Sequence, residues 1–273
     1  MNTFRTKTYQ LKSDKLPEGV RLRFALLADL HGVEHGEDNE ELLQAIHRMQ
    51  PDAVLIAGDM VVRGYPKTLD VARNLLYALS RKYPVYLAPG NHESGMSRSE
   101  SLSELYQTYE EGLCAHGVQV LHNQSAGTVF RGVPVQIYGL DLPKEYYKKP
   151  RSPKLTRGEL ETLLGQPGKD VLNILIAHNP KYAKAYFAWN SDLTVSGHYH
   201  GGIVRLSEHR GLACPQYLLF PPFCCGDFHR DGRHMVVSAG LGEHTMPVRI
   251  HNPRELLFID ISGPDDRSFI QNR

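Results

Sequence analysis

The feature that most restricts the fold of this chain is a series of short, almost wholly apolar runs separated by amphipathic segments. Examples are LRFALLA before Asp29, AVLIA before Gly58, and VLNILIA before His178. Runs of this kind are typical of strands that are covered on both faces, as in layered α/β proteins. Between the early runs, residues 39–50 and 67–80 place apolar side chains at helical spacing. The first part of the chain therefore predicts the order β-α-β-α-β.

The later part of the chain reads differently. HMVVSAGLG and ELLFIDI have the composition of strands, with little helix between them. We expect them to belong to a second, more antiparallel sheet that completes an α/β sandwich. The 273 residues show no composition break and no linker, so residues 1–273 are predicted to form a single domain.

Charge and composition exclude several classes of protein. The net charge is +1, from 31 basic and 30 acidic residues, so a dedicated nucleic-acid-binding protein is disfavoured. No apolar run has the length of a signal peptide core or of a transmembrane segment, and we expect a cytoplasmic protein. The four cysteines have no CxxC spacing, which favours reduced, buried thiols over a zinc ribbon or a disulfide framework.

Polar side chains that bind metals follow the apolar runs repeatedly. The carboxyl ends of strands in an α/β sheet are where a ligand cleft forms, so these residues are expected to converge in space. One such residue alone is usually structural, and Gly-Asp pairs are usually turns, so the weight lies with the ordered set. That set consists of Asp29, His31, Asp59, Asn91, His92, His178, His198 and His200.

The spacing within the set indicates shared sites. Side chains at i and i+2 of an extended segment face the same side, so Asp29 with His31, and His198 with His200, are natural ligand pairs. Carboxylate and imidazole together suit Mn, Fe, Zn or Co better than Ca or Mg. The candidates are too many for one tetrahedral ion, which points to two divalent ions with Asp59 as the natural bridge.

The order D-x-H, G-D, G-N-H-E, H and G-H-x-H closely resembles the calcineurin-like metallophosphoesterase superfamily. Within it, SGHYHGG and PVRIHNPREL resemble the bacterial branch of small phosphodiesterases that is related to the UDP-2,3-diacylglucosamine pyrophosphohydrolases. The resemblance implies a four-layer αββα sandwich in which two mixed β-sheets are flanked by helices. It also implies hydrolysis of a phosphodiester or pyrophosphate bond by a hydroxide that bridges two metal ions.

Carried over by motif, the resemblance assigns a role to each residue of the set. Asp59 would bridge the two ions, and His92 would assist the leaving group as a catalytic residue without binding metal. Glu93, beside it, is expected to orient His92 by accepting a hydrogen bond. The remaining ligands divide into one group for each ion, with Asn91, His178 and His198 holding one and Asp29, His31 and His200 holding the other.

Several questions stay open at this stage. The expected substrate is a small phosphate ester or a nucleotide-linked pyrophosphate, and a lipid-linked substrate with peripheral membrane association is an alternative. A phosphomonoesterase is the main rival, because the metal motifs are shared. A non-catalytic metal-binding scaffold is disfavoured, because His92 and all expected ligands are present. The basic, tyrosine-rich residues 143–159 form either a solvated loop or a rim for a phosphate-bearing substrate.

Overall fold

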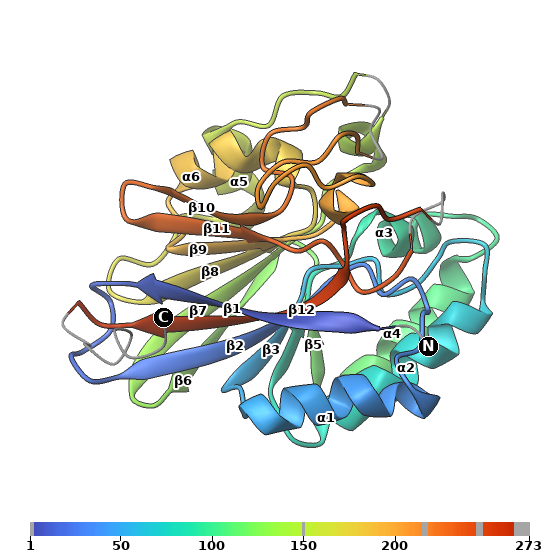
Figure 1. The fold of residues 1–273 in the computed structure, drawn as a ribbon, viewed down its shortest axis with the longest axis horizontal. Coiled ribbons are helices and arrows are strands. Elements are labelled where there is room, and N and C mark those ends of the chain that lie inside the picture. Colours follow the sequence, from blue (N-terminus) through green and yellow to red (C-terminus); the bar gives the residue numbers. More distant parts are fainter. Residues whose placement is uncertain (1–2, 149–150, 215–217, 244–247, 265–273) are drawn as a thin grey trace.

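The structure, a computed structural model, describes residues 3–148, 151–214, 218–243 and 248–264. Two mixed six-stranded sheets face each other, and helices cover their outer faces (Figure 1). The predicted α/β sandwich of four layers is therefore confirmed.

The first sheet has the order β1-β12-β2-β3-β4-β5. All its pairings are parallel except that of β12 with β2. Its strands are β1 (Phe4–Lys12), β12 (Arg254–Ser262), β2 (Arg21–Leu27), β3 (Ala53–Ile56), β4 (Val85–Leu87) and β5 (Val118–Val120). The helices on its outer face are α1 (Glu40–Met49), α2 (Lys67–Ser80) and α4 (Ser103–Ala115).

The second sheet has the order β10-β11-β9-β8-β7-β6, with antiparallel pairing at both edges. Its strands are β10 (Gly226–Arg230), β11 (Arg233–Val237), β9 (Leu193–Ser196), β8 (Leu172–Ala177), β7 (Val133–Leu140) and β6 (Gln124–Phe130). Helices α5 (Arg157–Leu164) and α6 (Ala183–Trp189) cover it. The short elements are α3 (Asn91–Ser97) and the 3-10 turns η1 (Glu37–Asn39), η2 (Lys144–Tyr147), η3 (Pro180–Tyr182) and η4 (His200–Gly202).

One strand lies in a different sheet from the one expected. β11 belongs to the second sheet, as predicted, but β12 lies in the first sheet, between β1 and β2. There it is parallel to β1 and antiparallel to β2. An apolar run shows that a strand is buried and carries no information about its neighbours, which is why the sequence did not reveal this placement.

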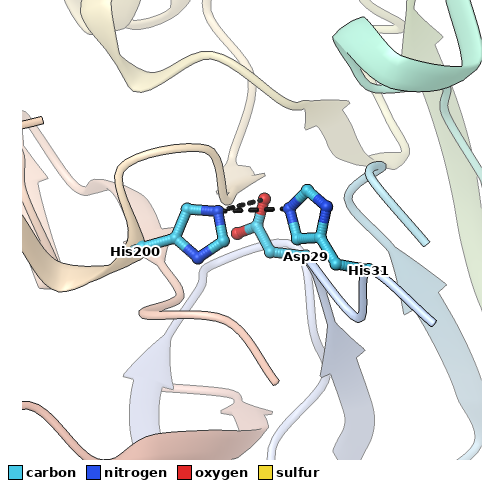
Figure 2. Close-up of side chains that lie close together, drawn as sticks. All are labelled: Asp29, His31 and His200. Carbon is cyan, nitrogen blue, oxygen red and sulfur yellow. Dashed lines mark hydrogen bonds and ion pairs between the residues drawn. The ribbon is translucent and has the colours of Figure 1, made fainter. Parts of the chain in front are cut away.

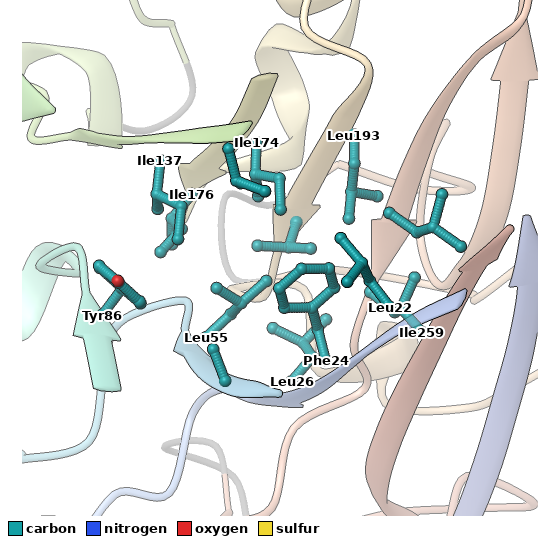
Figure 3. Close-up of a cluster of buried hydrophobic side chains, with 14 of the residues drawn as sticks. Leu22, Phe24, Leu26, Leu55, Tyr86, Ile137, Ile174, Ile176, Leu193 and Ile259 are labelled. Carbon is teal, nitrogen blue, oxygen red and sulfur yellow. The ribbon is translucent and has the colours of Figure 1, made fainter. Parts of the chain in front are cut away.

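The main core lies between the two sheets. Figure 3 shows side chains of β2, β3 and β12 pointing toward those of β7, β8 and β9, with Phe24 and Ile174 among them. A second cluster joins the first sheet to α1, α2 and α4, and a third joins the second sheet to α5 and α6. Each strand of the interior is thus covered on both faces, which accounts for the continuous apolar runs. No helix of the described residues is both long and apolar enough to cross a membrane.

Candidate metal centre

The carboxyl ends of the central strands of both sheets meet at one edge of the sandwich. Asp29 follows β2, Asp59 follows β3, and His178 and His198 follow β8 and β9. Backbone hydrogen bonds tie these loops together: Asp29 N–H donates to Gly58 O at 2.9 Å, and His31 N–H donates to Asp59 O at 3.1 Å. The polar side chains after these strands therefore gather in one place.

The first cluster contains Asp29, His31 and His200, which come from both sheets (Figure 2). His31 Nε2 and His200 Nε2 are 3.2 Å apart, and His200 Nε2 lies 3.7 Å from Asp29 Oδ1. The Asp29 carboxylate also accepts a hydrogen bond from the backbone N–H of His198 at 2.9 Å. One ligand atom from each of the three side chains lies within 4.8 Å of the others, which is close enough for them to share an ion.

The second cluster contains Asp59, His178 and His198, all of which are buried. His178 Nδ1 lies 2.6 Å from the carbonyl oxygen of Ala57, to which it donates, so Nε2 is left to face the carboxylates. Nε2 lies 3.0 Å from Asp59 Oδ2 and 4.0 Å from Asp29 Oδ1. Asp59 Oδ2 is also 4.0 Å from His31 Nε2, so Asp59 stands between the two clusters.

Asn91 and His92 begin α3, directly beside Asp59. The backbone N–H of His92 donates to Asp59 Oδ1 at 2.9 Å, and the His92 ring lies edge-on to the His31 ring at 5.0 Å. His31, Asp59 and His92 form a third group of close donor atoms, so distance alone does not separate a ligand from a non-ligand here. Asn91 Oδ1 is buried and has no hydrogen-bond partner among the described residues.

The backbone at these residues is unusual. Asp29, His31, Asp59, His198 and His200 all have positive φ values, between 49° and 70°. Non-glycine residues adopt this conformation at a cost of about 1–3 kcal/mol each, and such residues cluster at functional sites. The fold therefore holds five of the predicted ligands in strained turns, which aims their side chains into one small volume.

Close packing of backbone accompanies this strain. Gly58 has φ +75°, and Gly90 packs against Asp59 so tightly that a Cβ atom on Gly90 would overlap the Asp59 carboxylate. Glycine at position 90 is thus required by the position of Asp59.

The hydrogen bonds of the Glu93 carboxylate go to backbone N–H groups and not to the His92 ring, so the expected orienting role is wrong. Glu93 is 1% exposed, and its oxygens accept hydrogen bonds from the backbone N–H groups of Asp59 at 2.9 Å, Met60 at 2.7 Å and Gly90 at 3.0 Å. His92 Nδ1 instead accepts a hydrogen bond from the backbone N–H of Arg63 at 2.9 Å. Glu93 therefore holds the turn that carries Asp59, and the Arg63 backbone orients His92.

Burial and charge oppose each other in this site. Burial raises the pKa of Asp29 to about 7, although His178 acts in the other direction. Burial also disfavours the charged form of Asp59, but attraction to His178 and His92 outweighs it and holds the pKa of Asp59 well below its ordinary value. Burial lowers the pKa of His178, and the negative charge of Asp59 overcomes this effect and raises that pKa to about 9. A proton on His178 thus balances part of the buried negative charge, and a divalent cation at the same place would release it.

Two residues near the centre were missed by the sequence reasoning. The Tyr147 ring contacts the His198 ring edge-on at 5.4 Å, and Arg249 Nη2 lies 3.4 Å from His200 Nδ1. Arg249 is held in place by the carbonyl oxygens of Ala239 and Gly242. Tyr147 lies in the tyrosine-rich segment and Arg249 in the PVRIHNPREL motif, so both stretches were noticed, although neither residue was.

Comparison with known proteins agrees with this geometry. A family model described as calcineurin-like phosphoesterase matches residues 22–202. An uncharacterized metallophosphoesterase of Aquifex aeolicus is 26% identical over 261 residues, which is 95% of this chain and 92% of that protein. The glycerophosphodiester phosphodiesterase GpdQ of Enterobacter lignolyticus is 50% identical over 46 residues, 17% of this chain and 16% of that protein.

A structural likeness supports the fold. The structure of the NAD nucleotidase NadN of Haemophilus influenzae matches with a TM-score of 0.52 and 14% identity, covering 83% of this chain and 46% of that one. The matching family model spans most of the chain, including every predicted ligand and His92. The chain therefore belongs to the calcineurin-like phosphoesterase family, which indicates that it is a metal-dependent phosphohydrolase.

Proposed function

We propose that the chain uses two divalent metal ions to hydrolyse a phosphodiester or pyrophosphate bond. The observation that carries this proposal is the position of Asp59, whose Oδ2 lies 3.0 Å from His178 Nε2 and 4.0 Å from His31 Nε2. One carboxylate thus lies between two groups of donor atoms, which is the arrangement that a pair of bridged ions requires.

The residues present fit such ions. The donors are aspartate, asparagine and histidine, a set that accepts Mn, Fe, Zn or Co. Asn91 Oδ1 is buried without a hydrogen-bond partner among the described residues, and a cation would satisfy it. Asp59 would contact both ions, with Asp29, His31 and His200 holding one and Asn91, His178 and His198 holding the other. The bound ions would lower the pKa of a water molecule and neutralise charge on the phosphoryl oxygens.

His92 is proposed to assist the leaving group and not to bind metal. Its Nδ1 accepts the Arg63 backbone N–H, so the proton of the neutral ring is on Nε2. A protonated Nε2 offers a hydrogen bond and no lone pair. His92 would therefore donate to the leaving oxygen and stabilise the charge that develops there, which is commonly worth ~10²-fold or more in rate.

The preference for diesters rests on two supports. One is the short but strong similarity to GpdQ, whose printed name describes a phosphodiesterase. The other is the resemblance of SGHYHGG and PVRIHNPREL to the branch related to UDP-2,3-diacylglucosamine pyrophosphohydrolases. We infer from these a small phosphodiester or nucleotide-linked pyrophosphate as substrate. We further propose, from the sequence alone, that one catalytic domain carries out the hydrolysis in the cytoplasm.

The test begins with protein stripped by a chelator and then supplied with manganese. Hydrolysis of bis-p-nitrophenyl phosphate is compared with that of p-nitrophenyl phosphate, in the wild type and in His92→Asn. His229→Asn serves as the matched control, because His229 is exposed on β10. We expect metal-dependent cleavage of the diester that falls at least ~10²-fold in His92→Asn and is kept in the control.

Other results would replace the proposal. Cleavage of the monoester alone would identify a phosphomonoesterase. Cleavage of neither compound with Mn, Fe, Zn or Co, nor of a nucleotide-linked pyrophosphate such as UDP-2,3-diacylglucosamine, would favour a metal-binding scaffold.

A further inference from the structure

A cavity of about 210 Å³ opens directly beside the predicted metal ligands. Asn91 and His92 are part of its wall, which also contains three basic side chains, those of Arg63, Arg98 and Lys144. The cavity therefore begins on the side of His92, where the proposed function places the leaving group.

Not all of the basic side chains that line the cavity are paired with a carboxylate. Arg98 Nη2 is paired with Asp141 Oδ2 at 2.8 Å, and the same carboxylate oxygen lies 3.0 Å from His122 Nδ1. In the described ranges of the chain, no carboxylate pairs with the side chain of Arg63 or Lys144. Two cations thus remain available for an anion that enters the cavity.

Contacts with α3 fix the position of Arg63. Its backbone N–H binds His92, and its side chain crosses α3 where Gly95 lies. A Cβ atom on Gly95 would lie 3.0 Å from Arg63 Cδ and 3.1 Å from Nη1. Glycine at position 95 therefore leaves room for the Arg63 side chain to lie close against the helix, and a methyl group there would press on it.

On these grounds we propose that the cavity binds a leaving group that itself carries an anionic substituent, such as a phosphate or carboxylate. The proposal rests on the proposed function, because it uses His92 to define the leaving side. The volume of about 210 Å³ is far more than one water molecule needs. This space accommodates the anionic part of a leaving group, such as a small charged alcohol or a single substituted ring.

The proposal also gives a role to part of the basic, tyrosine-rich segment. Lys144 and Tyr147 both belong to η2 and both line the cavity. In this role the segment is a substrate rim and not only a solvated loop. Guanidinium and ammonium groups are the side chains that bind phosphate and carboxylate most strongly, which fits this assignment.

The test uses two diesters that differ by one carboxylate group on the leaving group. One is methyl 4-nitrophenyl phosphate, which releases 4-nitrophenol. The other is the matching methyl diester of 5-hydroxy-2-nitrobenzoate, which is the same nitrophenol with a carboxylate. The measured quantity is the ratio of kcat/KM for the carboxylated diester to that for the plain one. The variants are the double substitution Arg63→Gln with Lys144→Gln, and Gly95→Ala, whose methyl group presses on the Arg63 side chain without removing its charge. Lys148→Gln is the matched control, because Lys148 is exposed just beyond η2 and does not line the cavity.

We expect the ratio to fall about tenfold in the double variant, which is the size expected for the loss of two partly exposed charge pairs. It should also fall in Gly95→Ala and stay at the wild-type value in Lys148→Gln. A ratio that stays at the wild-type value in both Arg63→Gln with Lys144→Gln and Gly95→Ala would overturn the proposal.

Binding of free 5-hydroxy-2-nitrobenzoate, measured by calorimetry, separates this proposal from the proposed function. Binding that requires Arg63 and Lys144, in a protein that hydrolyses neither diester, would support the cavity and refute the function. Hydrolysis of both diesters, with no such binding and no preference for the carboxylated one, would support the proposed function and refute the proposal for the cavity.

Discussion

The turn that carries Asp59 should depend on the negative charge of Glu93. Its Oε2 accepts N–H groups from Asp59 at 2.9 Å and Gly90 at 3.0 Å, and its Oε1 accepts N–H groups from Met60 at 2.7 Å and Val61 at 3.4 Å. Glu93→Gln keeps the size of the side chain but turns one of these oxygens into an NH₂ group. Whichever way the amide lies, two backbone N–H groups then face a donor.

The expected cost follows from these contacts. A hydrogen bond to a charged group contributes about 1.5–3 kcal/mol, so the loss of two should lower the free energy of unfolding by about 3 kcal/mol at the low end. That figure is the effect of the hydrogen bonds alone. Burial and the charge of Asp59 raise the pKa of Glu93 to about 7, so the folded chain disfavours the charged carboxylate and Glu93→Gln also relieves that cost. A measurement at pH 8, where the carboxylate is charged, tests whether the loss of the hydrogen bonds is the larger of the two effects. Manganese affinity should fall as well, because the turn positions Asp59.

Urea unfolding followed by circular dichroism measures the stability, and calorimetry measures metal binding. Glu100→Gln is the matched control, because Glu100 is exposed shortly after α3. If Glu93→Gln unfolds within about 0.5 kcal/mol of the wild type, the size of effect usual for a neutral surface change, the reasoning is refuted.

Four further outcomes are expected. Asp59→Asn should lower metal-dependent hydrolysis by more than ~100-fold and reduce the bound metal measured by mass spectrometry, and full metal content would argue against a bridging role. Gly90→Ala should weaken metal binding in competition with a chelator, because the new methyl group overlaps the Asp59 carboxylate. Chelation should lower the melting temperature, and added manganese should restore it by an amount that grows with the logarithm of the free manganese concentration. Hydrogen bonds from His122 to Asp141 and Glu110 raise the pKa of His122 to about 9 from 6.5, so its stabilisation is full below pH 6.5 and is lost as pH rises through 9. The stability difference between wild type and His122→Asn should therefore shrink over that range, and a constant difference would contradict it.

Much of the fold followed from local patterns. The runs that became β2, β3 and β8 are apolar throughout, and the segments that became α1 and α2 have helical periodicity. Both kinds of pattern come from burial of the element itself, and the chain carries this information locally. The neighbours of β12 depend on which strand pairs with which across the whole chain, and the sequence reasoning placed that strand in the wrong sheet.

The candidate site divides in the same way. Metal-binding residues after strands could be picked out, because parallel strands bring their carboxyl ends together. The partners of His92 Nδ1 and most partners of Glu93 could not be identified, since they are backbone N–H groups about thirty residues away in the chain. Contacts of that kind depend on how two loops pack together, and no residue type in the sequence indicates them.

The pairing of β1 with β12 affects how the protein can form as it is synthesised. In the described residues β1 has no strand neighbour other than β12, which separates it from β2. The ribosome therefore synthesises β1 about 240 residues before β12. Until β12 is made, the edge of β2 that will pair with it has no strand partner. The first sheet is complete only after β12 has been synthesised. The positive-φ turns after β2 and β3 should therefore reach their final conformation late, after translation of β12.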